Sequence, residues 1–204
     1  MPKLAVLVAV TVTVTVALTV TGCGGEDEPD TEKQSAAPAP SAMPTTQRLT
    51  WGEAAQVSGS KGGRIRVTPL AVLYTPGAKQ SGKAENGLYA VISLKVEAVD
   101  KPDTTAGGAG GGLQWRGAGR TIATGDGNTA TTAWTGAVPE FDSLIEPGHP
   151  REGIETFDVP SKGGRLVYLN PEDRTIAASW DMPATDQGST LGLAKVHKRI
   201  RMFS

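Results

Sequence analysis

The sequence predicts an all-β sandwich for its central part, on three observations. Between about residues 48 and 183, apolar and polar residues alternate in short runs, which is the period of half-buried strands. Turn-forming residues are frequent, with 26 Gly and 14 Pro among 204 residues, and they separate the runs. No window in this region has a sustained helical period. About seven short strands divided by regular turn signals are typical of an antiparallel sandwich.

The N-terminus predicts export and lipid attachment. After Met1-Pro2-Lys3, a run from Leu4 to Val20 contains only apolar residues and Thr, and it is short for a membrane span. It ends at Val20-Thr21-Gly22-Cys23, which resembles the lipobox of bacterial lipoproteins. The resemblance implies that residues 1–22 are a signal peptide and that Cys23 receives a diacylglyceryl group, so two acyl chains hold the protein at the membrane. The alternative is a plain signal anchor with a buried Cys.

Residues 23–46 read as a disordered tether. They contain five acids, then an Ala-Pro stretch, and no aromatic residue. Such a composition cannot bury enough apolar surface to order the chain, and Ala-Pro stretches are semi-extended spacers. The sandwich is therefore expected over residues 47–183, followed by a basic tail at 184–204.

The first two expected strands span residues 64–75 and 88–99. In the first, Ile65 and Val67 are odd-numbered but Leu70 and Val72 are even-numbered, so a bulge is expected near Pro69. In the second, even-numbered apolar residues from 90 to 98 form one face, and polar residues from 93 to 97 form the other.

The remaining strands are expected at 113–123, 129–137, 154–159, 165–169 and 175–181. Asp126-Gly127-Asn128 predicts a hairpin turn between the first two of these. In the last segment, Ile176, Ala178 and Trp180 are expected on one face. The large core side chains are expected to be Trp51, Trp115, Trp134, Phe157 and Trp180.

The order of these segments resembles a known family. Ile145-Glu146-Pro147-Gly148 and Phe157-Asp158-Val159-Pro160 match a turn and a strand signature of immunoglobulin-like domains related to the mycobacterial immunoprotective antigen. The resemblance covers roughly residues 50–182 and implies an immunoglobulin-like sandwich. It supplies no catalytic residues.

The C-terminal segment from Leu191 predicts a basic amphipathic helix. Leu193, Val196, Ile200 and Phe203 fall on one helical face. Four basic residues, Lys195, Lys198, Arg199 and Arg201, could contact an anionic membrane surface. The alternatives are a frayed tail and a short helix packed on the sandwich.

A search for reactive groups finds no catalytic motif. Gly-x-Ser-x-Gly, His-Glu-x-x-His and a phosphate-binding Gly-rich loop are absent from the sequence, and the loop from Asp126 lacks the Glu that calcium needs. One Cys excludes a Cys-based zinc cluster and two His leave little for metal binding, so no cofactor is expected; calcium binding by Glu140, Asp142 and Glu146 is the alternative to a solvated loop. A net charge of −1 does not favour nucleic acid.

The sequence therefore predicts a non-enzymatic, lipid-anchored, extracytoplasmic binding domain. Its partner would be an unidentified protein or envelope component. Candidate binding residues lie in the loop at 139–152, namely Glu140, Phe141, Asp142, Glu146 and His149. The alternatives are a surface hydrolase that uses the loop carboxylates and a purely structural envelope spacer.

Overall fold

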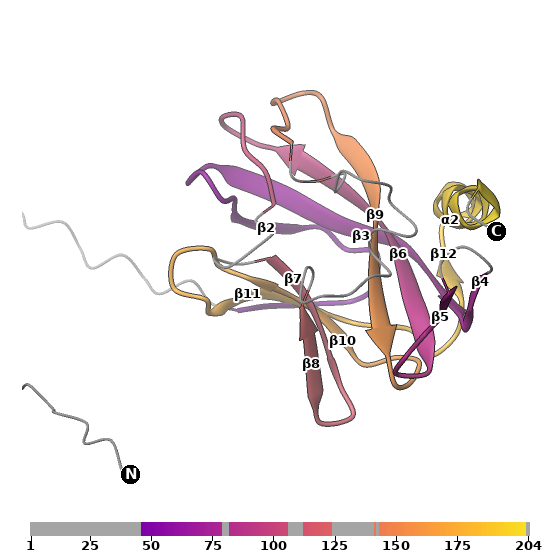
Figure 1. Cartoon of the computed structure of the whole chain (residues 1–204). Helices are drawn as coiled ribbons and strands as arrows, with labels where there is room; N and C mark the ends of the chain where they lie inside the picture. The colour runs from indigo at the N-terminus through magenta and orange to yellow at the C-terminus, as the bar shows by residue number, and fades with distance from the viewer. Residues whose placement is uncertain (1–45, 79–81, 106–111, 124–140, 142, 203–204) are drawn as a thin grey trace, which may run out of the picture. The chain divides into compact units, whose positions relative to one another are not determined.

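The computed structural model describes residues 46–78, 82–105, 112–123, 141 and 143–202. In these residues the chain forms two packed β-sheets and one C-terminal helix, which confirms the predicted sandwich (Figure 1). The signal peptide, nearly all of the tether, the Asp126–Asn128 turn, the strand at 129–137 and Trp134 lie outside the described residues. No helix in the described part has the length and apolar composition needed to cross a bilayer.

The first sheet has the strand order β1-β11-β10-β7-β8. Its neighbouring strands are antiparallel, except that β1 runs parallel to β11. A purely antiparallel sandwich was expected, and β1 was missed because three residues are too few to show a period. The five strands are β1 (Gln47–Leu49), β11 (Ile176–Asp181), β10 (Arg165–Leu169), β7 (Gly112–Gly117) and β8 (Arg120–Ala123).

The second sheet is built on β3, β6 and β9, all antiparallel. Two shorter strands pair with different halves of β3, and a separate two-stranded ribbon lies between β3 and β6 in the sequence. The main strands are β3 (Arg64–Thr75), β6 (Leu88–Ala98) and β9 (Arg151–Val159). The short ones are β2 (Ala55–Ser58), β12 (Gln187–Gly188), β4 (Gly77–Ala78) and β5 (Gly82–Lys83).

The bulge expected near Pro69 is confirmed. The register between β3 and β6 shifts between Pro69 and Ala71, so Ile65 and Val72 both face the core despite their opposite parity. The bulge lets one 12-residue strand bury apolar residues along its whole length.

The core lies between the two sheets. Trp115, Phe157 and Trp180 are fully buried there, as expected, and Trp51 packs against its edge. The even-numbered face of β6, from Ala90 to Ala98, also belongs to this core.

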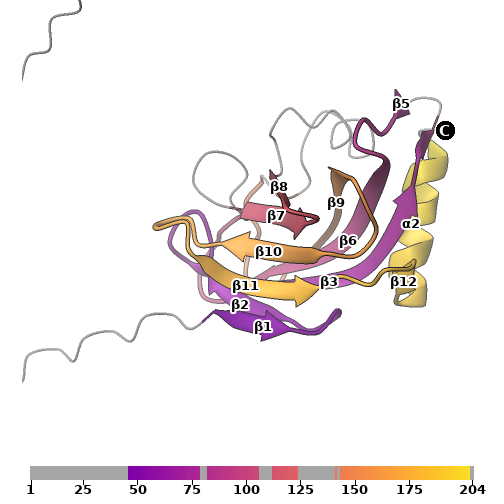
Figure 2. The ribbon, with the colours of Figure 1, turned by 90° about the horizontal axis from the view of Figure 1, so that it is seen from below.

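The opposite face of β6 is not simply solvated. Tyr89, Val91 and Ser93 are buried, and the first two belong to a second apolar cluster that includes Val196 of α2 (Thr190–Met202). Figures 1 and 2 show α2 beside the sheet of β3 and β6. The predicted C-terminal helix is therefore present, and Val196 packs on the sandwich.

Two local expectations about strands are wrong. Residues 113–123 form a hairpin instead of one strand, because Ala118 and Gly119 take positive φ values of 48° and 73°. Such a pair makes the tight turn that twisted hairpins favour. A bulge in the β10–β11 pairing also places Leu169 opposite Ile176, so Ala177 packs against the core while Ile176 faces the opposite side of the sheet.

Asp100 gives the fold a pH-dependent contact after β6. Its carboxylate accepts hydrogen bonds from Arg64 N (2.8 Å) and Arg64 Nε (2.9 Å). The backbone bond from Arg64, with help from its guanidinium, lowers the pKa of Asp100 from 3.8 to about 2.

A carboxyl group whose pKa is lower in the folded state stabilises the fold above its unfolded pKa and loses this effect as pH falls. The difference in free energy of unfolding between the native protein and Asp100→Asn should be constant above about pH 5. It should shrink as pH falls toward 2. Urea titrations across this range measure it, and a difference that does not change with pH would contradict the assignment.

Candidate functional site

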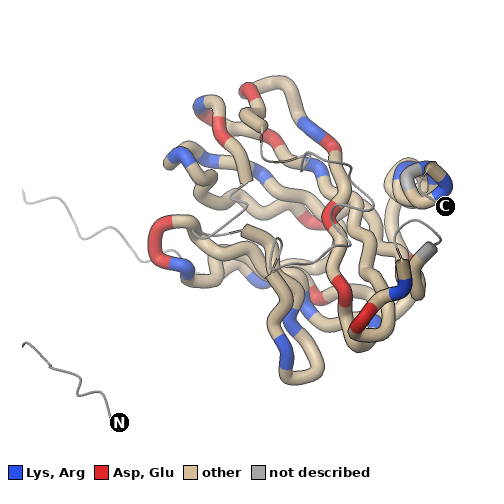
Figure 3. The backbone as a smooth tube through the Cα atoms, in the orientation of Figure 1, with Lys and Arg blue, Asp and Glu red and all other residues tan. Residues whose placement is uncertain are grey.

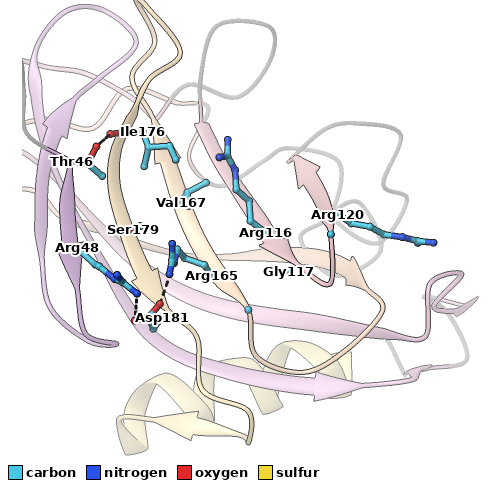
Figure 4. Close-up of a pocket in the computed structure, with 12 residues that line it drawn as sticks. Thr46, Arg48, Arg116, Gly117, Arg120, Arg165, Val167, Ile176, Ser179 and Asp181 are labelled. Atoms are coloured by element: carbon cyan, nitrogen blue, oxygen red, sulfur yellow. Dashed lines mark hydrogen bonds and ion pairs between the residues drawn. The ribbon is translucent and has the colours of Figure 1, made fainter.

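A groove of about 710 Å³ lies on the outer face of the first sheet (Figure 4). Each of the five strands contributes one charged residue to its lining. In strand order from β1 to β8, these are Arg48, Asp181, Arg165, Arg116 and Arg120. The Arg120 side chain points away from the other four, because Arg120 shares a face of β8 with Ile122, which packs on the core. The outer face therefore carries three guanidinium groups and one carboxylate, a net charge of +2.

The strand period brings four of these side chains, those of Arg48, Asp181, Arg165 and Arg116, to one face. Leu166 and Tyr168 of β10 point into the core, so Arg165 and Val167 point outward. Arg165 lies directly opposite Asp181 on β11 and directly opposite Arg116 on β7. The groove is therefore the outer side of the same strands that bury Trp115 and Trp180.

Asp181 partly neutralises the positive charge at one end of the groove. Arg165 Nε donates to Asp181 Oδ1 at 3.1 Å, and Arg48 Nη2 lies 3.7 Å from Asp181 Oδ2. Figure 4 shows Arg48 and Arg165 both reaching Asp181. The Asp181 side chain is 60% exposed, so water and salt weaken both ion pairs.

At the other end, the arginine side chains contact neutral acceptors among the described residues. Arg116 Nη2 donates to Gln114 Oε1 at 3.1 Å, and Arg120, which points away from the groove, donates from Nη1 to Asn86 Oδ1 at 2.8 Å. Arg116 Nε is buried and has no hydrogen-bond partner. Figure 3 shows basic residues on the β7–β8 hairpin. This end of the groove therefore combines the positive charge of Arg116 with an unsatisfied donor.

A glycine turn shapes the edge of the groove. Gly164 precedes β10 with a φ of 88°, and a Cβ there would lie 2.8 Å from Arg116 O. Trp115 Nε1 donates to Gly163 O, and Gly163 N donates to Tyr74 Oη, both at 2.9 Å. Burial raises the pKa of Tyr74, so its hydroxyl stays protonated and donates to Pro183 O.

Among the described residues, those predicted to form the binding loop do not come together as one site. Glu140 and Asp142 lie outside them. Phe141 is 1% exposed and belongs to the core, so its ring is not presented at the surface, and its expected binding role stays a prediction. It is buried because a large apolar ring gains more between the sheets than at a surface. Glu146 and His149 are exposed, and the described residues place no second carboxyl of the predicted set beside Glu146.

Helix α2 presents part of the predicted basic surface. Lys198 and Arg201 are exposed, while Lys195 Nζ lies 3.7 Å from Glu152 Oε2 of β9. The side chain of Arg199 and residue Phe203 lie outside the described residues. Val196 is fully buried against the sandwich, so membrane contact by a docked helix would involve its basic side. That contact stays a prediction.

Comparison with known proteins identifies no relative. No family model matches the chain, and neither the curated proteins nor the solved structures include a significant match. Within the described residues, no group of three or more His, Cys, Asp and Glu side chains could hold a metal ion. The argument for function therefore depends on the groove and on the N-terminal sequence.

Sequence reasoning missed the groove. Its outward-facing arginines lie at positions 48, 116 and 165, and only the strand order brings them onto one sheet face. One signal was present, because placing Leu166 and Tyr168 in the core already implied that Arg165 faces outward.

Proposed function

We propose that the protein is a lipid-anchored, extracytoplasmic binding domain of the immunoglobulin-like class, and that it is not an enzyme. The observation that carries the binding role is the arginine-lined groove of about 710 Å³. This volume lies in the range of small-molecule sites. A purely structural spacer would need no such concentration of like charge on one sheet face.

The anchor and the tether support the location. Cys23 is the only cysteine and follows a short apolar run. The acidic and Ala-Pro residues behind it separate the sandwich from the bilayer. A domain held in this way samples ligands in the envelope beside the membrane, and its open sheet face is available to them.

Mass spectrometry of the mature N-terminus tests the location. We expect the first residue to be Cys23 with a diacylglyceryl adduct, and Cys23→Ala to remain unprocessed and unlipidated. An intact Met1 terminus with a free Cys23 thiol in the cytosol would contradict the proposal.

Capture of envelope fractions on the purified full chain tests the binding role. We expect Arg116→Gln/Arg165→Gln to lose a ligand that the native protein retains. A ligand retained equally by both proteins would exclude the groove as the binding site.

A further inference from the structure

Two guanidinium groups lie side by side in the groove without a carboxylate between them. Arg165 and Arg116 are directly opposite on neighbouring antiparallel strands and point to the same face. Like charges at such positions repel each other and destabilise the sheet. Asp181 lies on the other side of Arg165, so the repulsion between Arg165 and Arg116 is only partly offset.

Arg116 adds an independent sign that a group is missing. Its Nε is buried and has no hydrogen-bond partner, while Nη2 donates to the neutral Gln114. Burying a donor without an acceptor is unfavourable. An anionic oxygen bound beside Arg116 could satisfy this donor and reduce the repulsion from Arg165.

The charges also extend across most of the sheet. The outward-facing guanidinium groups run from Arg48 on β1 to Arg116 on β7, and four adjacent strands span about 14 Å. One small anion cannot contact guanidinium groups that far apart. A chain with anionic groups at intervals can, because each planar guanidinium can bind a phosphate or carboxylate group through two hydrogen bonds.

We propose that the groove binds a linear polyanion, a polymer whose repeating units carry phosphate or carboxylate groups. This inference rests on the proposed binding function and specifies the ligand class of the same groove. Arg116 and Arg165 grip one anionic group between β7 and β10. Arg48 contacts a neighbouring unit, and Asp181 restrains Arg48 and Arg165 when the groove is empty.

Titration of the full chain in detergent tests the proposal with two probes, inorganic polyphosphate and polygalacturonate, each longer than the span of about 14 Å. We expect saturable binding of at least one probe that weakens as salt rises, because counterions are released on binding. Binding of only one probe identifies the anionic group as phosphate or carboxylate. Orthophosphate and monomeric galacturonate should bind more weakly than their polymers.

Variants distinguish binding in the groove from a general effect of the positive charge of the protein. Arg116→Gln/Arg165→Gln should lower the affinity about tenfold or more, because two bidentate contacts between guanidinium and anionic groups are lost. Asp181→Asn should raise it about threefold, because a competing negative charge is removed. A gain in affinity cannot result from misfolding of the variant. The matched control, Lys61→Gln/Lys83→Gln, removes two exposed positive charges that do not line the groove and should leave the affinity nearly unchanged.

Three results would overturn the inference. One is the absence of binding to both polymers, and another is an equal loss of affinity in the lysine control. The third is binding only to vesicles that contain anionic phospholipid. If these results occur while envelope capture still depends on Arg116 and Arg165, the ligand class is wrong and the binding function stands.

Discussion

Replacing Asp103 by alanine is expected to lower the free energy of unfolding by about 3 kcal/mol. Asp103 is fully buried, and its carboxylate accepts hydrogen bonds from three backbone amides, those of Lys61 (2.9 Å), Gly63 (2.5 Å) and Thr104 (2.7 Å). Alanine would leave all three donors without this acceptor. Urea unfolding followed by tryptophan fluorescence of the full chain measures the loss.

The surroundings of Asp103 explain why glycine occupies positions 59 and 63. The Asp103 carboxyl group fills the space beside both glycines, where a Cβ would lie within 2.6 Å of it. The matched control is Asp181→Asn, which removes an exposed carboxylate with two ion pairs and should cost less than about 1 kcal/mol. Equal losses of stability in the two variants would show that Asp103 does not hold the loop after β6 to the β2–β3 turn.

Replacing Gly164 by alanine is expected to cost about 3 kcal/mol, from backbone strain and overpacking together. The φ of 88° disfavours any residue with a Cβ. The new methyl group would also lie 2.8 Å from Arg116 O and 2.9 Å from Trp115 Nε1. Thermal or urea unfolding of the variant measures the combined effect.

Gly119→Ala provides a control in which the substitution introduces backbone strain but no steric contact. Its φ is 73°, but a Cβ there meets no atom within 4 Å. Gly119→Ala should therefore cost about 1–2 kcal/mol. The difference between the two alanine variants isolates the steric contact with β7. If the two variants lose equal stability, β7 relaxes away from Gly164 and the groove edge is less rigid than its contacts indicate.

Local periodicity was enough to predict the main strands. The alternation in 88–99 and 165–169 and the phase change at Pro69 are properties of neighbouring residues, so they could be found without knowing the partners. The helix was also found locally, from the spacing of Leu193, Val196 and Ile200. Its N-terminus is fixed by a local contact, because Gly192 N donates to Ser189 Oγ at 3.0 Å.

The sequence-based predictions failed where contacts between segments distant in the chain decide where a side chain lies. Ile176 faces outward only because the bulge against Leu169 shifts its register. Phe141 became a core residue although its neighbours in sequence suggested a polar loop. The role of Asp103 depends on amides about 40 positions earlier in the chain.

By itself, the sequence determined the layered β fold, the main strand faces and the C-terminal helix, because each follows from interactions among residues close together in the chain. Only the tertiary structure decided the groove. It places β1, β7, β8 and β10 in one sheet with β11, and strand order depends on which distant segments exchange backbone hydrogen bonds. Three arginines that are distant along the chain, Arg48, Arg116 and Arg165, thereby become one charged surface.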